Sequence, residues 1–259
     1  MGWKVATFNV NGIRARLQHV QDWIRSHEPD VLCLQEIKCT AEQFPFETFA
    51  SLGYVASVHG QKAFHGVAIL SRQTPDAILT GFRDGGADEE ARLIAAQFDP
   101  TWVVNTYVPQ GRDPADPAFQ VKLQFFSRLR GWLQERFQPN QPLVWVGDIN
   151  VAPEPLDVFD PKRLEGKIDF HPEERLAYER VRSWGFVDVF RKHHPDTKQF
   201  TFWDYRIPGS LPKNLGWRLD HILCTPPLAD RSRECAVDQN QRALAQPSDH
   251  APVWAVFDR

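Results

Sequence analysis

The stretch LVWVGDINVAP, from Leu143 to Pro153, runs four large apolar residues into two polar ones. A run this apolar is typical of a strand with both faces buried. Asp148 and Asn150 stand two positions apart, and in an extended chain such residues point the same way. We therefore predict a buried strand that ends by presenting a carboxylate and a carboxamide to one spot.

A segment near the N-terminus has the same design. VATFNVNG, residues 5–12, is an apolar strand pattern that ends in Asn9 and Asn11, again two positions apart. The same argument predicts that this pair converges beyond its strand. A single polar residue at a strand end usually satisfies a turn, so the functional interpretation depends on how many such ends the chain contains.

About nine segments have the composition of strands, and three have helical periodicity. The strand patterns are KVATFNV (4–10), DVLCLQE (30–36), YVASVHG (54–60), GVAILSR (66–72), RLIAAQF (92–98), WVVNTYV (102–108), LVWVGDI (143–149), RLDHILC (218–224) and PVWAVFDR (252–259). The helical patterns cover residues 13–24, 119–137 and 172–184. Strict alternation of strand and helix does not fit these elements, whereas two packed sheets with helices on their outer faces use them all. No linker divides the chain, so we expect one domain spanning residues 1–259.

The overall charge indicates no general affinity for nucleic acid. The chain has 30 Lys and Arg residues against 33 Asp and Glu, a net charge of −3. A polyanion would therefore need a local basic patch or a bound cation. The cysteines lack the close pairing of a zinc ribbon or a thioredoxin motif, so we expect reduced, structural thiols. They are Cys33, Cys39, Cys224 and Cys235.

No segment approaches the roughly 20 apolar residues of a membrane span. The N-terminus passes almost directly into a strand pattern, which does not resemble a signal peptide. Gly2 does not complete a myristoylation motif, because the sixth residue is Ala6. These features predict no membrane partner and a cytoplasmic protein, associated with the nucleoid if the source is a bacterium.

Several strand patterns end in polar side chains, and together these residues describe one kind of chemistry. They are Asn9, Asn11, Glu36, Tyr107, Asp148, Asn150, Asp220, Asp249 and His250. A glutamate beside Asp or Asn offers hard oxygen ligands that suit Mg²⁺ or Mn²⁺ rather than zinc. A histidine with a carboxylate partner holds a fixed tautomer, and a further carboxylate can orient or deprotonate water. The set predicts metal-assisted hydrolysis of a phosphodiester.

These residues also stand in motifs that resemble the exonuclease III family, which includes the abasic-site endonucleases of base-excision repair and belongs to the DNase I-like superfamily. The motifs occur in the family's order, from about Val5 to Phe257: FNVNGIRAR, PDVLCLQEIK, GVAILS, YVPQG, GDINVAP, WGFVDVFR, FTFWDYR, GWRLDHILC and SDHAPVWA. The resemblance implies an α/β four-layer sandwich, in which two packed mixed β-sheets are flanked by helices. It also implies a Mg²⁺-dependent enzyme, with Mn²⁺ as a possible substitute, that cleaves DNA phosphate esters.

The resemblance also implies roles for individual residues. Metal ligation is expected of Glu36, Asn11, Asp249 and Asn9, and catalytic roles are expected of Asp148, His250, Asn150, Tyr107 and Asp220. In this scheme Asp148 aligns or activates the attacking water, Asn150 and His250 hold the scissile phosphate, and Asp220 pairs with His250. Some relatives carry Asp in place of Asn11, so a second metal contact is expected to be weaker here. Lys38 is equally compatible with a solvated charge and with a role near the site.

DNA contacts and a sugar pocket are implied in the same way. The candidate DNA-binding residues are Arg14, Lys62, Arg206 and Lys213, although any one of them could be an ordinary solvated charge. Phe202, Trp217 and Leu219 stand where relatives line the pocket for a flipped-out abasic sugar. An apolar slot would favour a bare sugar, which is cheap to extrude because little stacking is lost.

Asp169 departs from the family pattern beside this pocket. Many abasic endonucleases have Gly or Ser there, and some members with a bulky residue act mainly on 3′ ends. Asp169 is therefore expected to narrow the pocket or to repel the DNA backbone.

The predicted substrates are double-stranded DNA with abasic sites, 3′-blocked nicks or recessed 3′ ends, and the enzyme is expected to act as a monomer. One alternative is a 3′-end exonuclease and phosphatase with little abasic incision.

Two more distant alternatives remain open from the sequence. Phosphatases of inositol phosphates or phospholipids use a similar core, although the motifs FTFWDYR, GWRLDH and WGFVDVFR favour DNA repair. The other is a catalytically silent DNA-binding scaffold, which would not need the complete polar set that this chain retains.

Overall fold

The computed structural model describes residues 2–85 and 90–258 and contains two six-stranded sheets. The first sheet has the order β11-β12-β1-β2-β4-β3, and the second has the order β5-β6-β7-β8-β10-β9. The first consists of β1 (Gly2–Asn9), β2 (Val31–Gln35), β3 (Val55–His59), β4 (Val67–Ser71), β11 (Ser232–Val237) and β12 (Val253–Asp258). The second consists of β5 (Ala77–Thr80), β6 (Leu93–Phe98), β7 (Thr101–Tyr107), β8 (Leu143–Asp148), β9 (Val187–Asp188) and β10 (Asp220–Cys224).

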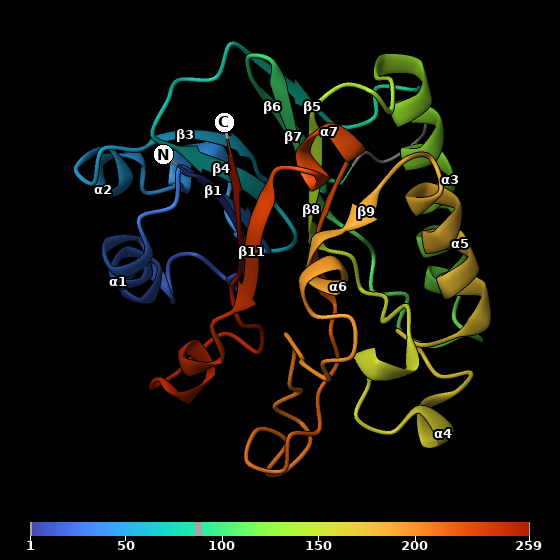
Figure 1. The fold of residues 1–259 in the computed structure, drawn as a ribbon. Coiled ribbons are helices and arrows are strands. Elements are labelled where there is room, and N and C mark those ends of the chain that lie inside the picture. Colours follow the sequence, from blue (N-terminus) through green and yellow to red (C-terminus); the bar gives the residue numbers. More distant parts are fainter. Residues whose placement is uncertain (1, 86–89, 259) are drawn as a thin grey trace.

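The sheets pack face to face, and helices cover their outer faces (Figure 1). One core cluster fills the space between the sheets, with side chains such as Val31 and Val146. A second joins the first sheet to α1 (Leu17–His27) and α2 (Phe46–Ala50). A third joins the second sheet to α3 (Pro117–Arg136) and α5 (Pro172–Arg182). The predicted four-layer α/β sandwich is confirmed.

The shorter helices lie at the rims of the sandwich. They are α4 (Pro161–Leu164), α6 (Val189–His193) and α7 (Pro226–Ala229), together with the 3₁₀ turns at Ala41–Gln43, Pro155–Asp157 and Gln239–Ala243. The two long outer helices begin at recognisable caps. Asp116 accepts a hydrogen bond from the backbone N–H of Ala118 at the start of α3, and His171 caps α5 in the same way. Proline follows each cap at a position where no N–H is required.

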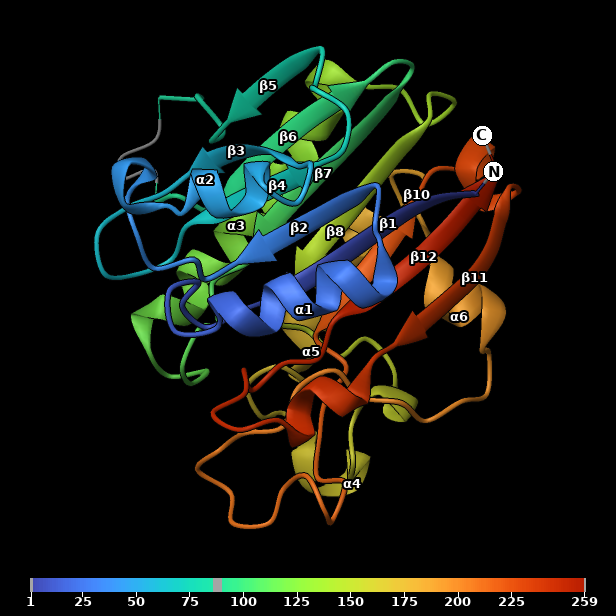
Figure 2. The ribbon, with the colours of Figure 1, turned by 90° about the vertical axis from the view of Figure 1, so that its left-hand side faces the viewer.

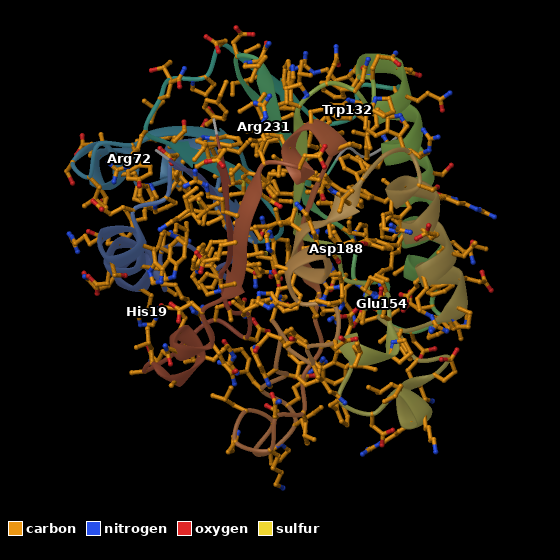
Figure 3. The ribbon with its side chains drawn as sticks, viewed as in Figure 1. His19, Arg72, Trp132, Glu154, Asp188 and Arg231 are labelled. Atoms are coloured by element: carbon orange, nitrogen blue, oxygen red, sulfur yellow. The ribbon has the colours of Figure 1, made fainter. Side chains whose placement is uncertain are left out.

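Strand register brings the predicted site residues to one end of the sandwich. In the parallel pair β1–β2, Asn9 lies opposite Gln35, so Glu36 follows immediately. In the second sheet, Asp148 of β8 lies opposite both Tyr107 of β7 and Asp220 of β10. β12 runs antiparallel to β1, so the segment before it returns to the same end. The chain termini lie at the other end of β1 (Figure 2).

Gly147 permits the close pairing of β8 with β7. A Cβ added at this position would lie 1.9 Å from the carbonyl oxygen of Thr106. Any side chain there would therefore force the two strands apart, just before Asp148. The glycine in the GDINVAP motif is required by packing rather than by chemistry.

The structure corrects several local predictions. All nine strand patterns form strands, but the strands β5, β9 and β11 were missed, as were α2, α4, α6 and α7. The first helix begins at Leu17, so Ile13 lies in the turn before it, and Trp184 lies beyond the end of α5. β5 and β9 are too short to show a period, and β11 begins with three consecutive polar residues that hide its strand pattern. No helix among the described residues is long and apolar enough to cross a membrane.

Candidate active site

The polar pairs Asn9/Asn11 and Asp148/Asn150 form matching turns. β1 ends at Asn9 and β8 ends at Asp148, and the second member of each pair has a left-handed backbone, with φ of 46° at Asn11 and 53° at Asn150. The backbone N–H of Asn11 donates to Asn9 Oδ1 at 3.0 Å, and that of Asn150 donates to Asp148 Oδ1 at 3.1 Å. The prediction that each pair shares one strand face was therefore wrong in its geometry. The pairs converge through Asx turns.

Asp148, His250 and Asp220 form a buried row. His250 Nδ1 lies 2.7 Å from Asp220 Oδ2, and His250 Nε2 lies 3.7 Å from Asp148 Oδ2. Burial alone would lower the pKa of His250, but the flanking Asp220 and Asp148 carboxylates outweigh it and raise the pKa to about 10. Burial raises the pKa of Asp148, while His250 opposes that shift. The imidazole is therefore held as a cation between two carboxyl groups, with its orientation set by Asp220.

Asn9 joins this row to Glu36 on the neighbouring sheet. Its Nδ2 donates to Asp148 Oδ2 at 2.8 Å and to Glu36 Oε1 at 2.9 Å. Its Oδ1 accepts from Asn11 N, so every polar group of the carboxamide is used. Asn9 is also fully buried. It therefore orients two carboxylates from different sheets, and it does so with its nitrogen rather than its oxygen.

The residues around Glu36 have the donor chemistry expected for Mg²⁺ or Mn²⁺. Asn11 Nδ2 donates to Asp249 Oδ1 at 3.0 Å, which draws that carboxylate toward the Glu36 side of the site. Carboxylate and carboxamide oxygens are hard ligands of the kind these cations prefer. Lys38 Nζ lies 2.8 Å from Glu36 Oε2 and also donates to Asn11 Oδ1. Burial would raise the pKa of Glu36, but the Lys38 ammonium lowers it below its usual value.

A second group of possible ligands is less suited to a cation. One ligand atom from each of Asp148, Asp220 and His250 lies within 4.8 Å of the others. However, His250 Nδ1 is already engaged by Asp220, and the histidine carries a proton because its pKa is raised to about 10. A metal ligand must be a deprotonated imidazole nitrogen. The row is therefore better suited to handling protons, and the Glu36 cluster fits the cation.

Two further predicted residues reach the same place. Asn150 Nδ2 donates to the Val108 carbonyl at 2.8 Å, which fixes the carboxamide and leaves its second N–H for another acceptor. Tyr107 is held by Arg92, whose guanidinium lies 4.7 Å from the ring centroid and donates to the Tyr107 carbonyl at 3.2 Å. Sequence reasoning missed Arg92, because an arginine at the start of a strand gives no signal of its own.

A pocket of about 320 Å³ opens beside these residues. Its lining contains the predicted slot residues Phe202, Trp217, Leu219 and Asp169, together with Glu36, Asp148, Asn150, Asp249 and His250. The Phe202 ring lies 4.8 Å from that of His250, so the apolar slot adjoins the proton-handling row. The pocket brings the slot residues together with six of the nine polar residues of the predicted set. Asn9, Asn11 and Asp220 do not line it but hydrogen-bond to residues that do.

Asp169 is bound inside this wall rather than free in the slot. Its Oδ1 accepts from Lys122 Nζ at 3.1 Å and its Oδ2 accepts from Gln110 Nε2 at 3.3 Å. Burial raises the pKa of Asp169, while the Lys122 ammonium opposes that shift. Lys122 therefore offsets the negative charge, which weakens the expectation of DNA repulsion and leaves the steric one. Lys122 was not identified from the sequence, because a lysine on a helix is usually exposed to solvent.

Of the four predicted DNA-binding residues, only Arg206 lines the pocket. Arg206 is ion-paired with Asp204 at 2.8 Å. Arg14, Lys62 and Lys213 are exposed and lie outside the pocket lining. Phosphate contacts around a site need not enter its cavity, so the role of these three residues stays a prediction. The four cysteines are free and buried, as expected.

Comparison with known proteins agrees with this arrangement. Residues 6–250 match the model of the endonuclease/exonuclease/phosphatase family. Exodeoxyribonuclease III of Haemophilus influenzae is 39% identical, and the match covers 98% of this chain and 99% of that protein. The structure of an AP endonuclease from Archaeoglobus fulgidus is 44% identical with a TM-score of 0.96, and the match covers 99% of this chain and 100% of that one.

A second solved relative is named as a 3′ phosphatase. It is the 3′ phosphatase NExo from Neisseria, bound to a product DNA hairpin, at 35% identity and a TM-score of 0.95, with 99% of this chain and 100% of that chain covered. An AP endonuclease and a 3′ phosphatase thus share this fold over nearly the whole chain. The chain belongs to the endonuclease/exonuclease/phosphatase family and is a nuclease of the exonuclease III and AP endonuclease type.

Proposed function

We propose that the protein is a Mg²⁺-dependent DNA repair phosphodiesterase, in which residues 1–259 act as one domain on double-stranded DNA. The observation that carries this proposal is the double hydrogen bond of Asn9, which holds the Asp148 carboxylate beside the Glu36 cluster. A group able to take a proton from water is thereby fixed next to a group able to bind a cation. Mn²⁺ has the same ligand preference and would substitute.

The proposed mechanism is an in-line attack of water on phosphorus. A bound Mg²⁺ would polarise the phosphoryl oxygen and stabilise the leaving oxygen. Asp148 takes a proton from the attacking water as its oxygen bonds to phosphorus. Protonated His250 and the free N–H of Asn150 donate to the phosphoryl oxygens, and Asp220 keeps the imidazole aligned. The bond from phosphorus to the 3′ oxygen breaks, and that oxygen takes a proton from solvent water to become a 3′-hydroxyl.

The single most informative experiment compares three DNA duplexes: one with an abasic site, one with a 3′-phosphate at a nick and one with a recessed 3′ end. We expect metal-dependent turnover of at least one of them and its loss when EDTA removes the cation. Activity that survives chelation would contradict metal assistance. Binding without turnover on any duplex would support the scaffold alternative.

We expect 3′-end processing to be at least as strong as abasic incision, because Asp169 occupies the pocket wall. Asp169→Gly removes this side chain at a position where φ is 67°, a left-handed conformation that glycine adopts freely. The ratio of abasic incision to 3′-phosphate removal should rise by about tenfold, since one obstructing group in a pocket is worth roughly 1–3 kcal/mol. The ratio is measured on the two duplexes under one Mg²⁺ concentration.

Asp169→Asn separates size from charge. Asparagine keeps the volume of the side chain and can still contact Gln110, but it lacks the carboxylate. If size decides, Asp169→Asn retains the wild-type ratio, and this is the expected result given the Lys122 ion pair. A ratio that shifts equally in both variants would show that charge decides, and a ratio unchanged in Asp169→Gly would remove Asp169 from substrate choice.

The alkaline limb of the pH profile should depend on Asp220. Because the pKa of His250 is raised to about 10, activity that needs the imidazolium should persist to high pH and fall as the proton is lost. Asp220→Asn removes a carboxylate that raises this pKa, so the limb should move to lower pH by at least about one unit. The measurement is kcat/KM against pH from about 7 to 10.5. An unmoved limb would mean that it does not report His250.

A further inference from the structure

A buried lysine connects three segments that line the pocket. Lys122 of α3 has no exposed surface. Its Nζ donates to the Asn150 carbonyl at 2.6 Å, to the Gln110 carbonyl at 3.1 Å and to Asp169 Oδ1 at 3.1 Å, and it is ion-paired with Glu174 of α5. An ammonium has three donors, so these four acceptors use all of them. Asn150, Gln110 and Asp169 all belong to the pocket lining.

Two of these acceptors belong to residues with an unusual backbone. Asn150 has a φ of 53° and Asp169 has a φ of 67°. Asparagine and aspartate adopt this left-handed conformation more often than other residues except glycine, and it persists where the surroundings hold it. The two segments are also joined by the backbone, because Ala152 N, two residues after Asn150, donates to the Asp169 carbonyl at 2.8 Å. Lys122 therefore contacts both residues with a left-handed backbone, Asn150 and Asp169.

A gain in stability does not by itself explain the buried ion pairs of Lys122. Burying an ammonium is costly, and replacing buried ion pairs with apolar groups of similar volume is often neutral or stabilising. Lys122 also places one cation between two carboxyl groups, Asp169 and Glu174, and burial raises the pKa of both. What the ammonium supplies is a fixed separation between Asn150 and Asp169.

We propose that Lys122 is a positioning residue that sets the aim of the Asn150 carboxamide and the location of the Asp169 wall. The proposal rests on the proposed function for its substrates. The two can fail separately: if the unaltered protein cleaves none of the duplexes, the proposed function fails. If it cleaves them and the Lys122 variants behave identically, only the positioning role fails.

The test uses two variants and one matched control. Lys122→Met keeps the length of the side chain without its charge. Lys122→Met/Glu174→Gln removes one charge of each sign, so that the net charge of the cluster does not change. Glu174→Gln alone leaves the contacts of Lys122 to Asn150 and Asp169 in place, and glutamine can still complete the cap of α5. For each protein, kcat and KM are measured on the abasic and 3′-phosphate duplexes, well below its Tm.

Both Lys122 variants should lose about 30- to 100-fold in kcat with KM changed less than about threefold, because a small displacement of a phosphate donor weakens the transition state most. The abasic to 3′-phosphate ratio should also change by about fivefold or more, because the pocket wall is released. Glu174→Gln should stay within about threefold of wild type in kcat. A purely structural lysine would lower Tm alone.

The proposal is overturned if a folded Lys122 variant keeps wild-type kcat and the wild-type substrate ratio. It is also overturned if both Lys122 variants fail to unfold cooperatively while Glu174→Gln folds normally, because Lys122 would then be needed for folding alone.

Discussion

Asp148→Asn is expected to lower kcat by about 10³- to 10⁴-fold, a loss of roughly 4–5.5 kcal/mol of transition-state stabilisation. The carboxamide has nearly the same shape, but it cannot accept a proton from water at any accessible pH. The fold should tolerate the change, because burial already raises the pKa of Asp148 and so disfavours its charged form. Single-turnover rates and Tm, measured on the same preparation, check both parts.

The control for this variant is Asp116→Asn. Asp116 caps α3 and does not line the pocket, and asparagine is an equally good cap, so both kcat and Tm should stay near wild type. If Asp148→Asn turns over DNA within about tenfold of wild type, another group takes the proton and the assignment of the base is wrong.

His250→Asn is expected to lower kcat by about 10²- to 10³-fold. Asparagine can still pair with Asp220, but it carries no positive charge to place against the phosphoryl oxygens. The remaining activity should lose the alkaline limb near pH 10, because the group that titrates there is absent. The pH profile therefore distinguishes loss of the imidazolium from general damage, which would lower the curve without changing its shape.

His171→Asn is the matched control for this substitution. His171 caps α5 through Nδ1, and asparagine is a favoured residue at such a position, so activity should be unaffected. His250→Asn with wild-type kcat would show that the phosphate is held by other donors. A wild-type pH profile with reduced kcat would assign the alkaline limb to a different residue.

Much of the fold could be predicted because it depends on local patterns. LVWVGDI is buried along its whole length as β8, and its apolar run alone predicted this. The excess of strand patterns over helical ones indicated two packed sheets, and the motif order indicated the family. The failures were at short elements such as β5 and β9, where pairing with a neighbouring strand rather than local propensity creates the strand.

The composition of the site could also be predicted, since polar residues at the ends of buried strands are conspicuous in the sequence. Their geometry could not. In each pair the strand ends at the first residue. The second residue, two positions later, has a left-handed backbone and is held by an Asx turn, so strand periodicity does not place it. The nitrogen of Asn9 faces two carboxylates because strands from different sheets meet there, and no local pattern records which sheets will meet.

The sequence by itself therefore determined the kind of enzyme and the two-sheet architecture, and it predicted the candidate site residues, because strand periodicity and motif order can be read along the chain. The tertiary structure decided which of those groups are charged and how they are aimed. For example, the Asp169 carboxylate is paired with Lys122, a residue 47 positions away in the sequence. Burial and long-range contact govern pKa and orientation, and both arise only when distant segments pack together.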